Sequence, residues 1–404
     1  MFKPRPLAAF CCAAAFLAAG AAAAQPSSDS GPVVRIHGMI SASVFAQDRA
    51  FGFGNGQNAV WAATGGDSDR WFVGGDVRNT RLSVELSDGD VVDGWLTSSV
   101  IEIDFFGGFA GSSAFSDEQP HPRLRSVFVD LSNGRTSLRV GQATTPLFGY
   151  VPASLSHVAF PLGLGSAGVI GWRQPGVFLK HRLNGAEAPV RVGLQLAAFR
   201  GSWSGPGSTV DHLSAGEAAV IPQLEARIDL DAAGTWGTWS LHVTGHYDRK
   251  DLSVVGAEPF VDGRLDGTAF QLGGRVMAGR LTVHGNVYSG RAIGQQFGQA
   301  TQFGDIGGWG GWLQMGATVM PRTSVWLFHG FEDPVDDDVR SEIGAGGRFD
   351  NMNRAAMLKH GRGAYAVGLE WLQSRTRWST DELHTGGEDT STGNQLAFSV
   401  LYTF

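Results

Sequence analysis

The sequence predicts an all-β fold, a 16-stranded antiparallel transmembrane β-barrel, and three observations support this fold class. Apolar and polar residues alternate at every second position along most of the chain, as in Arg81–Ser87, where Leu82, Val84 and Leu86 share one face. The predicted strands are joined alternately by short turns and by long connections. No run of 18 apolar residues follows Ala24, so no membrane-spanning helix is predicted.

An export signal occupies the start of the chain. Lys3 and Arg5 form a short basic region before an apolar, Ala-rich run, and Ala22–Ala24 supply small residues for cleavage after Ala24. The apolar run is too short for a comfortable membrane span, which disfavours the alternative of a membrane anchor. We therefore expect a signal peptide over residues 1–24, a short periplasmic segment over 25–33 and a barrel domain over 34–404.

The composition excludes several classes of protein. Both cysteines, Cys11 and Cys12, lie in the signal peptide, so neither disulfides nor cysteine–metal chemistry are expected in the mature chain. Removal of Lys3 and Arg5 lowers the basic count from 31 to 29 against 38 acidic residues, a net charge of −9 that argues against nucleic acid as a partner. The 58 Gly, 12 Trp and 25 Phe, with only 17% charged residues, are unlike a disulfide scaffold or a disordered linker.

Sixteen predicted strands follow the signal peptide in order. They cover residues 34–46, 78–87, 94–106, 123–131, 136–142, 172–183, 189–199, 220–230, 237–248, 267–277, 280–289, 309–319, 322–331, 350–359, 363–376 and 394–404. Seven short turns, such as Ser132–Arg135, alternate with eight long connections, such as 143–171. Short periplasmic turns opposite long extracellular loops are typical of outer-membrane barrels. A soluble β-sandwich or propeller also has alternating strands, but neither requires this rhythm, and the sequence has no repeated blade motif.

The last predicted strand has one apolar and one mostly polar face. The apolar residues recur at every second position, at Leu396, Phe398, Val400, Tyr402 and Phe404. The residues between them that are expected to face the lumen are Gln395, Ala397, Ser399 and Thr403. Because lipid tolerates no open sheet edge, this strand is expected to pair with the first strand, near Val34–Phe45, and to close the barrel.

Five short motifs resemble the trimeric porins of the Gram-negative outer membrane, especially DcaP-like porins. They are Asn79–Leu82, Ile103–Gly108, Arg123–Arg125, Leu138–Gln142 and Arg173–Pro175. The resemblance implies a homotrimer in outer-membrane lipid and lipopolysaccharide that passes small hydrophilic solutes and ions by diffusion, without a cofactor. The final strand, with Phe398, Val400, Tyr402 and the terminal Phe404, also resembles the signal that the barrel-assembly machinery reads.

The resemblance further implies that the third long loop folds into the lumen and sets the constriction. This loop, Ala143–Gly171, holds Tyr150 and His157 and has no Asp, Glu, Lys or Arg. The basic residues expected to line the pore beside it are Arg81, Arg123, Arg125, Arg139 and Arg173. Guanidinium groups beside a loop without carboxylates would favour anions at the narrowest point, and the resemblance suggests small carboxylates.

A charge-balanced pore is the alternative. If the third and fourth predicted strands, 94–106 and 123–131, pair with a register sum near 227, Glu102 faces Arg125 and Asp104 faces Arg123. The two carboxylates would then form a ladder of ion pairs with the arginines and would leave a general or cation-tolerant pore. The sequence leaves both selectivities open.

Other candidate sites are weaker. The side chains of Ser156 and His157 are adjacent and expected to diverge, and no nucleophile elbow is present, so a barrel enzyme is not expected. An adhesin or anchor would need larger loops. The Asp336–Asp338 run is either a Ca²⁺ or lipopolysaccharide contact or, more often, a solvated loop tip. His242 and His246 share a strand face but are too far apart for one metal, so no metal site is expected.

Overall fold

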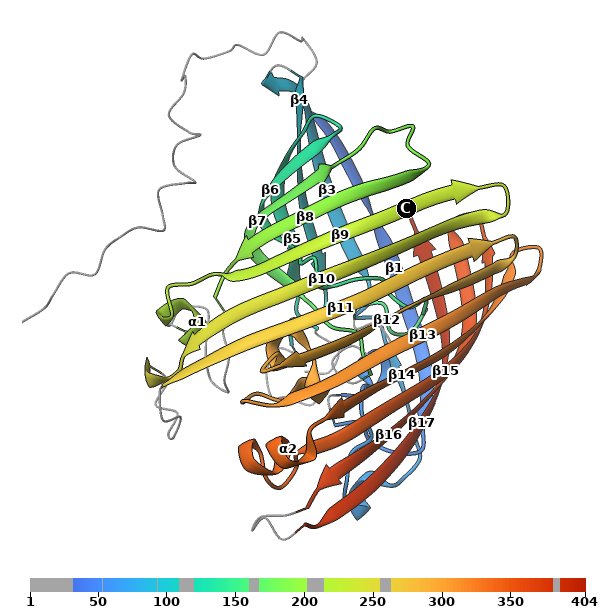
Figure 1. Ribbon diagram of the computed structural model, residues 1–404. Coiled ribbons are helices and arrows are strands. Elements are labelled where there is room, and N and C mark those ends of the chain that lie inside the picture. Colours follow the sequence, from blue (N-terminus) through green and yellow to red (C-terminus); the bar gives the residue numbers. More distant parts are fainter. Residues whose placement is uncertain are drawn as a thin grey trace, which may run out of the picture.

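The wall of the barrel is a single antiparallel sheet (Figure 1). The computed structural model describes residues 32–52, 54–92, 94–108, 120–159, 167–201, 214–254, 263–380 and 386–404. The strands are β1 (Val33–Gln47), β2 (Phe72–Asp76), β3 (Arg81–Val92), β4 (Trp95–Asp104), β5 (Arg123–Ser132), β6 (Thr136–Thr144), β7 (Arg173–Arg182), β8 (Val190–Phe199), β9 (Gln223–Gly234), β10 (Gly237–Asp251), β11 (Arg264–Ala278), β12 (Leu281–Arg291), β13 (Gly307–Met320), β14 (Thr323–Pro334), β15 (Arg348–Arg362), β16 (Tyr365–Ser379) and β17 (Glu388–Thr403).

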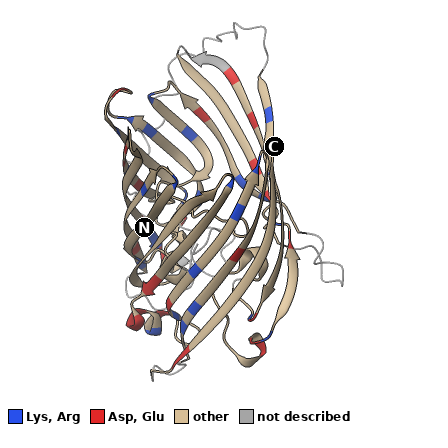
Figure 2. Ribbon diagram, turned by 90° about the vertical axis from the view of Figure 1, so that its right-hand side faces the viewer, with Lys and Arg blue, Asp and Glu red and all other residues tan. Residues whose placement is uncertain are grey.

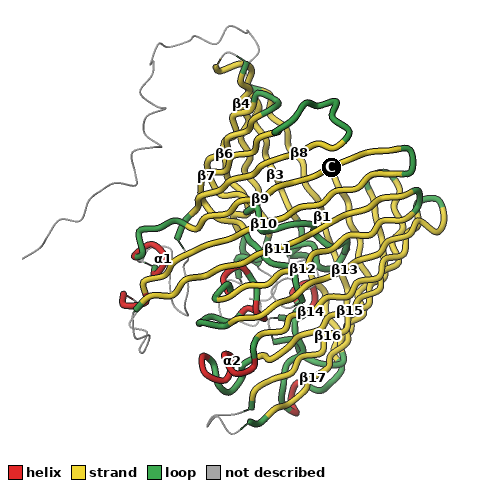
Figure 3. The backbone as a smooth tube through the Cα atoms, viewed as in Figure 1, coloured by secondary structure: helices red, strands yellow, loops and turns green. Residues whose placement is uncertain are grey.

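Helical structure is confined to the connections. The α-helices are α1 (Ala215–Ala218) and α2 (Asp336–Glu342), and the 3₁₀ turns are η1 (Gly56–Asn58), η2 (Gly66–Ser68), η4 (Leu252–Val254), η5 (Gly294–Gln296) and η6 (Gln299–Thr301). No helix among the described residues is long and apolar enough to cross a membrane. The short turns and the longer connections lie at opposite ends of the strands, as the tube in Figure 3 shows, and this agrees with the predicted alternation.

The second wall strand is interrupted, which the sequence pattern did not predict. Where one strand over 78–87 was expected, β2 pairs with the end of β1 (Ser43 opposite Asp76) and β3 pairs with its start (Met39 opposite Arg81). At the break, the Thr80 hydroxyl contacts the backbone N and O of Ser41, at 3.1 and 3.2 Å, in place of the ladder. Since β2 and β3 together fill one wall position, the described chain forms a 16-stranded closed barrel, as predicted.

The barrel closes where the sequence predicted. β17 pairs with β1 from Gln395 opposite Gln47 to Thr403 opposite Met39. Beyond the last strand residue, Gly38 and Phe404 exchange backbone hydrogen bonds of 3.0 and 3.2 Å. The sheet therefore has no free edge at this seam, which is the condition for a barrel that spans lipid.

The two faces of the wall are the inverse of those in a soluble sandwich. Gln395, Ala397 and Ser399 of β17 are 1–2% exposed, whereas Leu396 and Phe398 are 46% and 48% exposed. The large apolar side chains thus point outward and the polar and small ones point inward, as the alternation predicted. Thr403, which was expected to face the lumen, is exposed at the end of the strand, where its hydroxyl donates to the Ala364 carbonyl oxygen.

Candidate functional site

Four arginines gather on the inner face of the wall formed by β3, β4, β5 and β7. They are Arg81, Arg123, Arg125 and Arg173. We call these four residues, together with Glu102 and Asp104, the arginine cluster. Arg81 lies opposite Met39, which is halfway along β1, so the cluster is near mid-height of the barrel rather than at a mouth. Figure 2 shows that basic and acidic positions are interspersed along the wall strands. The selectivity of the lumen therefore depends on which of these charges are paired.

Two carboxylates of β4 neutralise part of the arginine cluster. Asp104 accepts hydrogen bonds from Arg123, Nε to Oδ1 at 3.0 Å and Nη2 to Oδ2 at 2.7 Å, and from Arg125 Nη1 at 2.7 Å. Glu102 accepts a hydrogen bond from Arg125 Nε at 2.9 Å, and the Arg81 Nη1 atom lies 3.8 Å from its other oxygen. These are charge-assisted bonds, and the pair between Arg123 and Asp104 is bidentate. The ladder of ion pairs that was expected as the alternative is therefore present.

The register at this ladder is shifted by one residue from the expected one. Asp104 lies opposite Arg123, as expected, but a β-bulge between Glu102 and Ile103 places Ser126 opposite Glu102, where Arg125 was expected. A bulge sets two residues of one strand against one of the other. Arg125 nevertheless points inward, is buried and reaches Glu102 with its side chain.

Arg173 is the member of the arginine cluster that lacks a carboxylate. Within the described ranges, no carboxylate oxygen lies within 4.0 Å of its guanidinium. The guanidinium stacks on the Trp172 ring, 3.9 Å from the ring centroid, and the side chain is buried. The ring face attracts the cation, and an arginine guanidinium stays protonated in proteins, so the stacking does not neutralise it. The arginine cluster thus carries four positive and two negative groups, a surplus of +2.

Arg139 lies apart from the arginine cluster. It makes a bidentate pair with Asp130 of β5, at 2.8 and 2.6 Å, and its guanidinium lies 3.6 Å from the centroid of the Phe128 ring. This residue lines the inner face as predicted, but its charge is balanced locally.

Buried Glu370 of β16 holds part of the connection between β6 and β7, of which residues 145–159 and 167–172 are described and are called the 145–172 segment. Its carboxylate accepts hydrogen bonds from the amides of Leu155 and Ser156, both at 3.1 Å, and from the hydroxyls of Ser154 and Ser156, at 2.8 and 2.9 Å. A segment without charged residues still has backbone N–H groups that must be satisfied when buried. One wall carboxylate satisfies two of them here.

Two further buried glutamates contact the backbone of the same segment. Glu225 of β9 accepts a hydrogen bond from the amide of Leu147 at 2.6 Å. Glu332 of β14 accepts one from the amide of Gly168 at 3.1 Å. Glu225 belongs to β9, whereas Glu332 and Glu370 belong to β14 and β16, on either side of β15, so the segment contacts two separate parts of the wall.

Side-chain amides of the wall add contacts of the same kind. Asn79, in the break between β2 and β3, donates to the Ser156 carbonyl at 2.6 Å and accepts from the Ala159 amide at 2.8 Å. Gln314 of β13 accepts from the Ala153 amide at 2.6 Å and donates to the Ala153 carbonyl at 2.8 Å. Both amides satisfy a donor and an acceptor of the segment at once.

The segment approaches β13 and β14 so closely that only glycine fits. Gly168 has φ of +90°, and a Cβ atom there would lie 2.4 Å from the backbone carbon of Gly311. A Cβ atom on Gly330 would lie 2.3 Å from the carbonyl oxygen of Ala167. This backbone-to-backbone contact gives a physical reason for the glycines on both sides.

Tyr150 and His157, both predicted as constriction residues, have different environments. The Tyr150 hydroxyl hydrogen-bonds to Ser240 of β10, its ring lies 5.2 Å from His242, and the side chain is half-buried. His157 is 1% exposed, and burial lowers the pKa of its imidazole. A neutral, buried imidazole packs the segment rather than attracting solute.

The expectation that Ser156 and His157 diverge is wrong. Ser156 Oγ and His157 Nδ1 are 2.8 Å apart, because both side chains turn toward the same pocket of the segment. Ser156 Oγ is also hydrogen-bonded to Glu370, and both residues are 1% exposed. A nucleophile must reach its substrate, so this buried contact does not resemble a catalytic pair.

The Asp336–Asp338 run lies in the first turn of α2. Asp336 pairs with Arg377 at 2.8 Å, and Asp338 pairs with Arg291 at 3.0 Å and accepts from the Gly307 amide at 2.9 Å. Acidic residues in the first helical turn also favour the helix dipole. Two of the three aspartates therefore fasten the helix to neighbouring strands.

The two strand histidines have separate partners. His242 is 3.1 Å from Gln271, and His246 is 2.9 Å from Glu225. Over the described part of the chain, no group of three or more His, Cys, Asp or Glu side chains is arranged to hold a metal ion.

Sequence reasoning missed the residues that hold the 145–172 segment. Glu225, Glu332 and Glu370 are single acidic residues at inward-facing positions of strands. An isolated Glu on the inner face of a strand, such as that in Leu369-Glu370-Trp371, is the signal that could have pointed to them. The sequence cannot show that the partner is a backbone some 215 residues away.

The chain has the fold of solved outer-membrane channels, which share it over nearly their whole length. The structure superimposes on the DcaP channel of Acinetobacter baumannii with a TM-score of 0.68 at 16% identity, over 93% of this chain and 99% of DcaP. OprB of Pseudomonas putida gives a TM-score of 0.59 at 9% identity, over 92% of this chain and 94% of OprB. OmpT of Vibrio cholerae, in a trimer form, gives 0.55 at 11% identity, over 93% of this chain and all of OmpT.

Sequence comparisons add nothing to this structural likeness. No protein-family model matches the chain, and no curated protein matches it. The similarity to outer-membrane porins expected from the five motifs is confirmed at the level of the fold.

Proposed function

We propose that this chain is an outer-membrane porin, which passes small hydrophilic solutes by passive diffusion and prefers anions. The closed barrel, its apolar outer face and its polar inner face support a water-filled channel in lipid. The likeness to solved outer-membrane channels supports the same location. The N-terminal signal peptide over residues 1–24 would export the chain, although these residues lie outside the described ones.

In this proposal the 145–172 segment folds into the lumen and narrows it. Its backbone contacts with Glu225, Glu332 and Glu370, which are buried side chains of three separated wall strands, support that path. The close approach of Gly168 to Gly311 supports it as well. His157 would pack the segment, and Tyr150, which is half-buried, would contact the solute path.

The anion preference depends on one observation: Arg173 has no carboxylate within 4.0 Å among the residues described. Asp104 and Glu102 compensate two of the four guanidinium charges, and the opposing segment contributes none. In a narrow lumen with low-dielectric walls, a surplus of +2 raises the local anion concentration.

A charge-balanced pore is the second candidate, and the pairs of Arg123 and Arg125 with Asp104 and Glu102 favour it. Reversal potentials of the purified protein in planar bilayers under a KCl gradient separate the two. We expect anion preference in the wild type and a smaller preference in Arg173→Gln. Arg280→Gln, which removes an exposed arginine at a short turn, serves as the control and should leave the potential unchanged. Cation preference of the wild type would refute the proposal.

Two non-channel functions are separated by the same measurement. An outer-membrane enzyme or an adhesin would not give stepwise, stable ion conductance, and the porin should. We also propose a homotrimer, which the trimer form of OmpT supports by analogy. Its mass in detergent, measured by light scattering, should be three times that of the monomer.

A further inference from the structure

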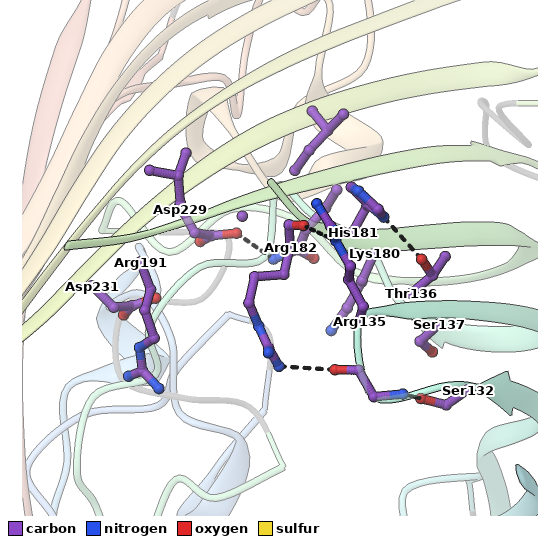
Figure 4. A pocket seen from close by; sticks show the side chains of 15 residues that line it. Ser132, Arg135, Thr136, Ser137, Lys180, His181, Arg182, Arg191, Asp229 and Asp231 are labelled. Atoms are coloured by element: carbon purple, nitrogen blue, oxygen red, sulfur yellow. Dashed lines mark hydrogen bonds between the residues drawn. The ribbon is translucent and has the colours of Figure 1, made fainter. Parts of the chain in front are cut away.

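A cavity of about 490 Å³ lies at the short-turn end of the barrel, bounded by the β5–β6 turn and by β7, β8 and β9 (Figure 4). The charged side chains that line it come from the β5–β6 turn (Arg135), β7 (Lys180, Arg182), β8 (Arg191) and β9 (Asp229, Asp231). None of them belongs to the arginine cluster. Lys180 follows Arg173 by seven residues on the same strand, roughly 23 Å at about 3.3 Å per residue, so the cavity is a separate place in the lumen.

The basic side chains that β7 and β8 contribute to this cavity are not compensated by carboxylates of the described residues. Across the described part of the chain, no carboxylate oxygen lies within 4.0 Å of Lys180, Arg182 or Arg191. Arg182 Nη2 donates to the Gly134 carbonyl at 2.8 Å, which orients the guanidinium without neutralising it. Figure 4 shows the guanidinium of Arg191 directed away from Asp231, its neighbour on the next strand.

The negative charge of Asp229 is already compensated by groups of its own wall. Its carboxylate accepts hydrogen bonds from Arg227 Nε at 2.7 Å and from Gln195 Nε2 at 2.6 Å. Asp231 is then the one acidic group of the cavity lining without a cation within 4.0 Å, counted over the described residues. Four cations, with Arg135 included, against one such carboxylate leave the cavity positive.

The space in the cavity depends on Gly193. This residue lies opposite both Arg182 and Asp229 on the neighbouring strands. A Cβ atom there would lie 3.6 Å from the Cβ of Asp229, an ordinary contact, so the backbone does not require glycine at this position. The missing side chain leaves room between the cations of β7 and Arg191.

We propose that this cavity is a second anion site, which binds a small organic dianion as it passes the short-turn end of the channel. The volume is within the range of roughly 300–1,000 Å³ of small-molecule sites. Lys180 and Arg182 are two residues apart on β7, about 7 Å, and Arg191 lies two residues before Gly193 on the neighbouring β8, so two acid groups of one solute can each meet a cation. A dicarboxylate and a phosphate ester share this chemistry. The site rests on the proposed channel function only for the route by which the solute arrives.

Binding to the purified full-length protein in detergent tests the site without requiring conduction. Titration calorimetry with succinate, glycerol phosphate and inorganic phosphate as probes should show binding of at least one of the two organic dianions, tighter than inorganic phosphate. In the Lys180→Gln/Arg191→Gln double variant the dissociation constant should rise about tenfold or more. Gly193→Leu should weaken binding similarly by filling the cavity with no change of charge. Arg362→Gln, an exposed arginine at the β15–β16 turn, is the matched control and should bind as the wild type does.

The same variants in bilayers separate this proposal from the porin proposal. If the wild type binds the dianion but does not conduct ions, and both cavity variants lose the binding, the porin function is refuted and the binding site is supported. An anion-selective channel whose dianion affinity is unchanged by both cavity variants would refute the site alone. Heat-modifiable migration of each variant shows that it is folded, and Gly193→Leu keeps the test valid if the double variant fails to assemble.

Discussion

Glu370 shows how a single inward-facing side chain can place a connection that carries no charge. Four donors converge on its carboxylate: two backbone amides and two serine hydroxyls of residues 154–156. Each buried donor left without an acceptor costs about 1–3 kcal/mol. The carboxylate therefore holds the 145–172 segment more firmly than the apolar contacts of a short loop could.

Replacing Glu370 with Ala should loosen this part of the segment. The loss of an acceptor for the Leu155 and Ser156 amides, at about 1–3 kcal/mol, corresponds to a roughly 5-fold to 150-fold larger equilibrium constant for local opening. Hydrogen exchange of these amides, followed by mass spectrometry, measures the change, and single-channel recordings should show a noisier open level. Glu85→Gln is the control, because Glu85 contacts Arg35 and His37 instead of the segment. Equal exchange rates in Glu370→Ala and wild type would contradict the anchoring role.

At the residue scale, the sequence predicted which side chains face inward better than it predicted their partners. Alternation alone places Arg81, Arg123 and Arg125 on one face of the wall, and in the structure each of them lies within 4.0 Å of Glu102 or Asp104. The β-bulge at Glu102 could not be predicted, because an added residue leaves no mark in an alternating pattern of this length. The adjacency of Ser156 and His157 was misleading, since a loop backbone can turn two neighbouring side chains to one side.

At the scale of elements, the seam between β1 and β17 is the part that sequence patterning predicted most completely. The register runs from Gln47 opposite Gln395 to Met39 opposite Thr403, and the alternating faces match. The break between β2 and β3 was missed because Thr80 replaces a ladder contact with its side chain, which sequence alternation does not record. Strand patterns report burial, whereas interruptions arise from contacts with distant residues such as Ser156.

Deletion of Phe404 should reduce assembly of the barrel. It removes both backbone hydrogen bonds between Gly38 and Phe404, each worth about 0.5–1.5 kcal/mol, together with an aromatic ring next to Tyr402. The amount of heat-modifiable protein in outer-membrane fractions measures the effect. Phe404→Tyr keeps the backbone bonds and the ring and should assemble normally. Wild-type amounts of folded protein after the deletion would count against Phe404 as part of the assembly signal.

The contact of the 145–172 segment with β13 gives a second prediction for an element. Gly168→Ala places a Cβ atom 2.4 Å from the backbone of Gly311, so the segment must move, and the single-channel conductance should change. Gly346→Ala is the matched control: its φ of +82° is similar to the +90° of Gly168, but nothing lies within 4 Å of the added atom. The control isolates steric contact from backbone strain. An identical conductance in both variants would place the segment away from the solute path.

At the scale of the whole molecule, the charge of the chain and the charge of the arginine cluster have opposite signs. Without residues 1–24 the chain has 29 basic and 38 acidic residues, yet the arginine cluster has four guanidinium groups against two carboxylates. Composition predicted the class of protein, since a Gly- and aromatic-rich, cysteine-free chain with alternating strands suits a barrel in lipid. It could not predict selectivity, which depends on the few charges that remain uncompensated at the narrowest place.

The difference in sign between the arginine cluster and the whole chain predicts how the anion-to-cation permeability ratio changes with salt concentration. The Debye length falls from about 10 Å at 0.1 M to about 3 Å at 1 M salt. A surplus of +2 in the arginine cluster should therefore give a larger anion-to-cation permeability ratio at 0.1 M than at 1 M KCl, because solution ions screen it at the higher concentration. Arg173→Gln should lower the ratio at 0.1 M and approach the wild type at 1 M. If the net charge of −9 governed permeation instead, dilution would shift the wild-type reversal potential toward cations, and the direction of that shift distinguishes the two.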